Sequence, residues 1–213
     1  MLLASSITGP QAIFATVAHR LFLLRHGQTE WSVNGRHTGR TDIPLTPAGE
    51  GQARAAGGTL RAVLGGNPAL VLSSPRTRAL RTAELAGLRV DEVIEELAEW
   101  DYGDYEGVTT PVIRETVPGW TVWSHPIPGG ESAEDVNARA DKLIERVREP
   151  LGEGDVILVG HGHFSRVLVA RWIGLPSTAG VHFGLDPAGV AVLGDERGEP
   201  QIEHLNLLPT AED

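Results

Sequence analysis

The sequence of 213 residues predicts an α/β fold in which helices cover both faces of a mainly parallel β-sheet. Two short segments, 21–24 and 69–72, are apolar at every position, which is typical of strands buried on both faces of a sheet. Such segments alternate along the chain with longer ones that begin at N-capping residues and have helical character. This alternation favours parallel strands that are joined by helices.

The strands are predicted from apolar runs, and the last two from a hairpin pattern around a turn at Gly194–Gly198. The predicted strands are 21–24, 69–72, 88–94, 155–159, 190–193 and 202–208. The helices are predicted from their first residues. Thr46–Pro47 and Ser74–Pro75 each place proline directly after an N-cap. Ser132 and Asp135 match a capping box. The predicted helices are 46–64, 76–86, 132–149 and 164–173.

The length fits one domain at 19–213, preceded by an N-terminal extension at 1–18 that we expect to be poorly ordered. A signal peptide is the less favoured alternative, because polar residues interrupt the apolar stretch of this extension. We therefore expect a cytoplasmic protein. Prolines, a glycine pair and two tryptophans, with little periodicity, predict a lid-like excursion at 107–130.

Composition excludes several classes of protein. There is no cysteine, so disulfides, thiolate zinc sites, iron–sulfur clusters and a catalytic thiol are excluded. The net charge of −10 has the wrong sign for wrapping nucleic acid or binding an anionic membrane. We therefore expect no nucleic acid or membrane partner.

Reactive side chains follow three of the predicted strands. Arg25 and His26 follow the first strand, Arg78 lies one turn into the helix after the second, and His161 and Gly162 follow the strand at 155–159. Because the carboxyl ends of parallel strands share one edge of a sheet, we expect these residues to converge. Arginines and backbone N–H groups bind phosphoryl oxygens, and an imidazole nitrogen can attack phosphorus. The pattern predicts a phosphoryl pocket that forms a phosphohistidine.

Such chemistry also needs a proton donor for the leaving oxygen. Glu99, which lies beside Trp100, is the natural candidate. Asp101, Asp104 and Glu106 are competitors, although charged residues in a loop are more often simply solvated.

Four sequence blocks in order resemble the histidine phosphatase superfamily, which includes the cofactor-dependent phosphoglycerate mutases. The blocks are Leu24–Trp31 with Gly39, Ser73–Pro75 with Arg78, Glu99 with Tyr102–Gly103, and Gly160–Gly162. The resemblance runs from about residue 20 to about residue 208. Within the superfamily the sequence looks most similar to small actinobacterial acid phosphatases.

The resemblance implies a phosphoglycerate mutase-like fold, a three-layer α/β/α sandwich. It implies that His26 is the nucleophile and that Glu99 protonates the leaving group and then deprotonates the attacking water. The groups implied to hold the phosphoryl oxygens are Arg25, Arg78, His161 and the Gly162 N–H. The resemblance also implies that no metal is needed and that a homodimer forms.

Some positions bear on the choice between phosphatase and mutase. Ser32 stands where the mutases have a phosphate-contacting asparagine, whereas Thr38 and Gly39 match their substrate-contacting pair. The excursion at 107–130 lacks the arginine pair that grips the substrate carboxylate in mutases; Arg114 is its only basic residue.

The short excursion and the missing carboxylate clamp favour a phosphatase that acts on a small phosphorylated metabolite, and the resemblance implies that it is metal-independent. We expect an acidic pH optimum, because Glu99 must be protonated while His26 stays neutral. The alternative is a phosphoglycerate mutase, which needs 2,3-bisphosphoglycerate as a primer; the phosphatase needs no cofactor. A non-enzymatic module that binds a phosphorylated ligand is the third hypothesis.

The remaining histidines and arginines are assigned more modest roles. The pair His161 and His163 has no acidic partner at ligand spacing, which disfavours a metal site. Among the other histidines, His37 and His125 are expected to lie nearest the pocket. Arg81 is expected to form ion pairs on a helix surface.

Overall fold

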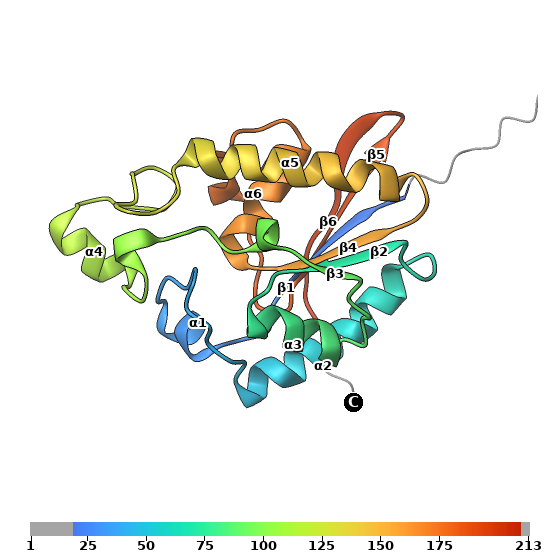
Figure 1. The fold of residues 1–213 in the computed structure, drawn as a ribbon, viewed down its shortest axis with the longest axis horizontal. Coiled ribbons are helices and arrows are strands. Elements are labelled where there is room, and N and C mark those ends of the chain that lie inside the picture. The colour runs from blue at the N-terminus through green and yellow to red at the C-terminus, as the bar shows by residue number, and fades with distance from the viewer. Residues whose placement is uncertain (1–18, 210–213) are drawn as a thin grey trace, which may run out of the picture.

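The computed structural model describes residues 19–209 and has three layers, with one sheet between two layers of helices (Figure 1). The strands are β1 (Leu21–Arg25), β2 (Leu70–Ser73), β3 (Glu92–Val93), β4 (Val156–Gly160), β5 (Val190–Glu196) and β6 (Glu199–Leu207). Their order across the sheet is β3-β2-β4-β1-β5-β6. The first four strands in this order pair in parallel, and β5 and β6 are antiparallel. The predicted α/β/α sandwich is confirmed.

The helices after Thr46 and Ser132 begin where these capping residues predict, but the predicted cap at Ser74 is wrong, because Arg76 is the N-cap of the next helix and makes no side-chain capping bond. The α-helices are α1 (Glu30–Asn34), α2 (Pro47–Val63), α3 (Thr77–Leu85), α4 (Thr110–Thr116), α5 (Ala133–Leu151) and α6 (Gly162–Trp172). Short 3-10 helices are η1 (Glu95–Leu97), η2 (Gly103–Tyr105) and η3 (Ser177–His182). Thr46 accepts a hydrogen bond from the Gly49 N–H, and Ser132 forms the predicted capping box with Asp135.

The strands β1, β2, β4 and β5 send alternate side chains into two separate cores. In β1, Leu21 and Leu23 belong to a cluster with residues of α5 and α6, whereas Phe22 and Leu24 belong to a cluster with residues of α2 and α3. All four side chains are completely buried. The central strands are therefore apolar at every position because both faces of the sheet are covered.

Two predicted elements are wrong in extent. The segment 88–94 forms strand pairs only at Glu92–Val93, which lie exposed at the edge of the sheet. The hairpin turn is confined to Arg197 and Gly198: β5 continues into the predicted turn as far as Glu196, and β6 begins directly after it at Glu199. Arg197 and Gly198 have φ values of 58° and 92°, and two positive φ angles suit the twist of a tight hairpin.

The segment 107–130 contains the short helix α4 and contributes to a core. Ile113 and Trp120 are buried in the cluster beneath α5, and the Arg114 guanidinium donates to the carbonyl of Trp120 at 2.9 Å. Whether the segment acts as a lid stays a prediction. The predicted extension at 1–18 lies outside the described residues, and within those residues no helix is both long and apolar enough to cross a membrane.

Gly57 in α2 is predicted to be required for the packing of α2 against the end of α3. A Cβ atom there would overlap the carbonyl oxygen of Ala86, whereas one at Gly51, in the same helix, would meet open space. Gly57→Ala should therefore lower the free energy of unfolding by about 1–3 kcal/mol. The matched control Gly51→Ala should raise it by about 0.5–1 kcal/mol. Urea unfolding of the two variants tests this, and equal effects would contradict it.

Candidate active site

The carboxyl ends of three neighbouring parallel strands bring the predicted residues together. The His26 N–H, just after β1, donates to the carbonyl of Gly160 in β4 at 2.9 Å. The Ser74 N–H, just after β2, donates to the carbonyl of Val159 at 2.9 Å. The rings of His26 and His161 lie edge to face with centroids 5.2 Å apart. The predicted convergence at one sheet edge is present.

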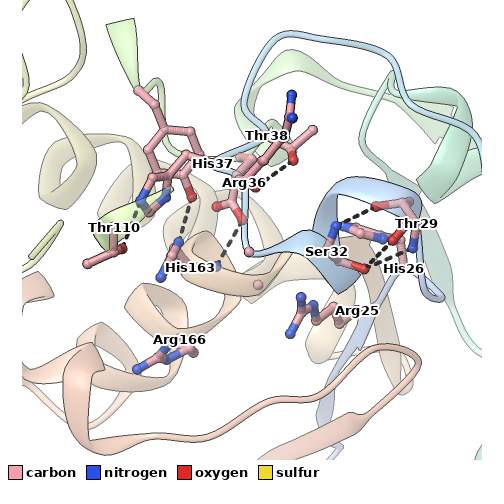
Figure 2. A pocket seen from close by; sticks show the side chains of 14 residues that line it. Arg25, His26, Thr29, Ser32, Arg36, His37, Thr38, Thr110, His163 and Arg166 are labelled. Carbon is pink, nitrogen blue, oxygen red and sulfur yellow. Dashed lines mark hydrogen bonds between the residues drawn. The ribbon is translucent and has the colours of Figure 1, made fainter. Parts of the chain in front are cut away.

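A cavity of about 280 Å³ opens beside these strand ends (Figure 2). Its wall contains three arginines and three histidines, and its only acidic residue is a glutamate. The lining residues are Arg25, His26, Thr29, Ser32, Gly35, Arg36, His37, Thr38, Glu99, Tyr102, Thr110, Gly162, His163 and Arg166. This composition suits an anionic ligand.

His26 presents one free ring nitrogen to the cavity. Its Nδ1 lies 2.7 Å from the carbonyl oxygen of Gly27. A carbonyl only accepts hydrogen bonds, so Nδ1 carries the proton and Nε2 keeps its lone pair. Burial, followed by the charges of Arg78 and Arg25, lowers the pKa of His26 well below its usual 6.5. The imidazole is therefore neutral and has the tautomer that a nucleophile needs.

His161 lies behind His26 and outside the cavity wall. Its Nδ1 accepts from Arg78 Nε at 3.3 Å, so the proton is on Nε2, which donates to Ser74 Oγ at 2.7 Å. Burial, then the nearby charge of Arg78, lowers the pKa of His161 well below its usual value. His161 is therefore a neutral hydrogen-bond donor in this structure.

Arg25 and Gly162 form one end of the cavity. Arg25 Nη1 donates to the carbonyl of Leu185 at 2.6 Å, while its buried Nε has no hydrogen-bond partner. A buried unpartnered donor is costly unless a ligand satisfies it. The Gly162 N–H, the first of α6, has no acceptor within the helix, so it is also available to an anion.

Arg78 is completely buried and binds backbone carbonyls instead of lining the cavity. Its Nη1 donates to Thr41 at 2.8 Å, and its Nη2 donates to Thr38 at 3.0 Å and Gly39 at 3.2 Å. Burial is the main cause that lowers the pKa of Arg78. Its position holds the loop 38–41 and His161 in place; direct contact with phosphate stays a prediction.

Glu99 is fixed by backbone N–H groups at the start of α6. Its Oε1 accepts from Trp100 at 2.9 Å and Phe164 at 2.7 Å, and its Oε2 accepts from His163 at 2.9 Å. The carboxylate is nearly buried but still lines the cavity. Since Oε2 has only one of these partners, it retains capacity to exchange a proton with a ligand.

Three further predicted substrate contacts lie differently from one another. Ser32 lines the cavity, but its hydroxyl is engaged in a capping box with Thr29. Thr38 also lines the cavity and donates to the carbonyl of Arg36. Gly39 does not line the cavity, and its N–H donates to Glu106 at 2.9 Å. The substrate contacts of all three stay predictions.

The sequence reasoning missed part of the cavity wall. Arg166 follows Gly162 by four residues, so helical spacing on α6 places both on one face. From the sequence, His163 is considered only as a metal ligand, yet it lines the cavity and its Nδ1 lies 2.6 Å from the hydroxyl of Tyr102. His37 lines the cavity as predicted, with a pKa that burial lowers to about 4.

Of two further predictions, the one for His125 is wrong and the one for Arg81 is confirmed. His125 is not among the lining residues and bonds to Ser124. Arg81 forms the expected surface ion pairs, with Glu50 and Glu84. Within residues 19–209, no group of three or more histidine, aspartate or glutamate side chains is arranged to hold a metal ion. Independence from metal stays a prediction.

Comparison with known proteins identifies the family. The model of the histidine phosphatase superfamily, branch 1, matches residues 21–208. The chain belongs to this superfamily. An acid phosphatase of Mycobacterium tuberculosis is 50% identical over 189 residues, which cover 89% of this chain and 93% of that protein. A 2,3-bisphosphoglycerate-dependent phosphoglycerate mutase of Rhizobium etli is 38% identical, covering 70% of this chain and 77% of that protein.

A solved structure from Mycobacterium tuberculosis has a TM-score of 0.87 and 49% sequence identity to this chain, covering 90% of this chain and 99% of that one. Membership of the superfamily is thus supported by both sequence and structure. It makes the chain a superfamily enzyme of the phosphatase or mutase type.

Gly162 is predicted to set the position of Arg25. A Cβ atom on Gly162 would lie 3.1 Å from Cζ and 3.2 Å from Nε of Arg25. Gly162→Ala should displace the guanidinium by a few tenths of an ångström and lower kcat/KM for phosphomonoesters roughly tenfold or more. Steady-state kinetics measure this, with Gly51→Ala as the control. Unchanged kcat/KM would show that Arg25 does not need this close approach.

Proposed function

We propose that the protein is a metal-independent phosphatase that hydrolyses small phosphomonoesters through a phosphohistidine on Nε2 of His26. The observation that carries the proposal is the neutral His26 ring, whose unprotonated Nε2 borders a cavity with arginine walls. The similarity to the mycobacterial acid phosphatase supports hydrolysis as the outcome.

The first step transfers the phosphoryl group to the protein. The Nε2 lone pair of His26 forms the N–P bond, while the P–O bond to the alcohol breaks and its electron pair goes to oxygen. Glu99 gives that oxygen a proton. The Nδ1–H bond to the Gly27 carbonyl stabilises the positive charge that develops on the ring. Arg25 Nε and the Gly162 N–H bind the non-bridging oxygens.

The second step returns the protein to its starting state. Water attacks phosphorus, the P–N bond breaks, and its electron pair returns to Nε2 of His26. Glu99 takes the proton from the attacking water, so the carboxyl group acts first as an acid and then as a base.

Residues 107–130 favour hydrolysis over the mutase reaction. Their only basic residue, Arg114, donates to the carbonyl of Trp120 and is not part of the cavity wall. The segment therefore offers no cationic clamp to retain a phosphoglycerate while it reorients. The similarity to the Rhizobium etli mutase keeps the mutase reaction as an outcome to be measured.

The decisive experiment follows 3-phosphoglycerate by phosphorus NMR with catalytic 2,3-bisphosphoglycerate present. We expect inorganic phosphate from the wild-type protein and a loss of activity of at least about 10³-fold in His26→Ala, because the nucleophile is absent. 2-Phosphoglycerate with little free phosphate would make the protein a mutase. Binding of phosphate without turnover, retained in His26→Ala, would make it a binding module.

The rate should remain high at acidic pH. The nucleophile must be unprotonated, and the lowered pKa of His26 keeps it so well below pH 6.5, while Glu99 must be protonated in the first step. We therefore expect kcat/KM to be bell-shaped with an optimum below pH 6.5, and Glu99→Gln to abolish the bell. An acid limb with its midpoint near 6.5 would contradict the assigned state of His26.

A further inference from the structure

The arginines of the cavity wall differ from most other arginines of the chain. Among residues 19–209, Arg25, Arg36 and Arg166 form no ion pair, whereas most other arginines contact a carboxylate. Glu99 is the only acidic residue in the same wall. The wall therefore carries three guanidinium charges, of which only that of Arg25 lies beside the proposed phosphoryl site at Gly162.

Arg166 is held rigidly and keeps donors for a ligand. Its Nε donates to the carbonyl of Gly180 at 3.0 Å, and its Nη2 donates to that of Val181 at 3.2 Å. The guanidinium packs on the ring of Trp123, with Cζ 4.7 Å from the ring centroid. These contacts leave Nη1 for a ligand. Because the guanidinium is already fixed, binding an anion costs little side-chain entropy.

Arg166 follows Gly162, which borders the proposed phosphoryl site, by one turn of α6. Gly162 and Arg166 are four residues apart on α6, so about 6 Å separate them along the helix axis. Both line the cavity, and Figure 2 shows Arg25 and Arg166 at different places along its wall. A phosphoryl group beside Arg25 and Gly162 therefore leaves the Arg166 guanidinium for another part of the same substrate.

We propose that Arg166 forms a second anion subsite, which selects phosphomonoesters that carry a carboxylate or a second phosphate in addition to the phosphoryl group that is transferred. The proposal rests on the proposed phosphatase function. A guanidinium binds both anions in the same manner, so their shared chemistry is what the subsite recognises.

The test compares kcat/KM for substrates that differ by one anionic group. Glycerol 3-phosphate and 3-phosphoglycerate differ by the carboxylate, whereas fructose 1-phosphate and fructose 1,6-bisphosphate differ by the second phosphate. In at least one pair, the wild-type protein should prefer the substrate that carries the second anionic group. Arg166→Met should remove that preference, lowering kcat/KM about tenfold or more through KM, as expected for a lost charge-assisted hydrogen bond.

Arg148→Met is the matched control, because Arg148 lies exposed on α5 and pairs with Glu145. It should leave every ratio unchanged. Arg166 also holds the backbone at Gly180 and Val181, so a purely structural role would lower the rates for all four substrates by the same factor. Arg166→Lys, which keeps the charge, should retain part of the preference.

The outcomes separate the two proposals. Hydrolysis of none of the four substrates by the wild-type protein would overturn the proposed function. If the ratio of kcat/KM between the two substrates of each pair is the same in the wild type and in Arg166→Met, the subsite alone is overturned. Loss of preference in one pair only would identify which anion the subsite takes.

Discussion

The site depends on the burial of one guanidinium, that of Arg78. A buried cation is strongly destabilising unless hydrogen bonds satisfy it, and Arg78 obtains them from the loop 38–41 and from the ring of His161. One side chain thereby joins α3, the loop after α1 and the residue after β4. Since His161 packs against His26, the position of the proposed nucleophile follows from the same set of bonds.

In this arrangement the arginines carry the positive charge and the histidines are neutral. Burial lowers the pKa of His26, His161 and His163, and the arginines beside them lower each further. The positive charge of the cavity therefore resides on the guanidinium groups, while the rings stay neutral. The site can bind an anion and keep an unprotonated nucleophile at the same time, because the positive charge lies on the arginines and the lone pair lies on His26.

The sequence could predict the sheet and the convergence of Arg25, His26 and His161, because apolar strands and strand-end residues are local patterns. It could not predict the acceptors of Arg78, which belong to a loop nearly 40 residues earlier and are set by tertiary packing. Gly39 matched a family motif, yet its N–H donates to the Glu106 side chain. The match to the motif could not show that this N–H already has an acceptor within the protein.

Arg166 was missed for a different reason. Its spacing from Gly162 was visible in the sequence, but an arginine in a helix is most often a surface residue. Only the structure shows that its guanidinium lies over Trp123 and that Arg166 lines the cavity.

Helix α6 supplies groups to both the proposed phosphoryl site and the proposed second anion subsite. The first turn of α6 supplies the Gly162 N–H and the N–H groups that hold Glu99, and the next turn supplies Arg166. A substrate anion on Arg166 would therefore be aligned with the phosphoryl site by helix geometry alone, without movement of a loop. In such a design the superfamily's strand-end residues provide the proposed chemistry, and a single position one turn along α6 changes which phosphoesters are well placed for it.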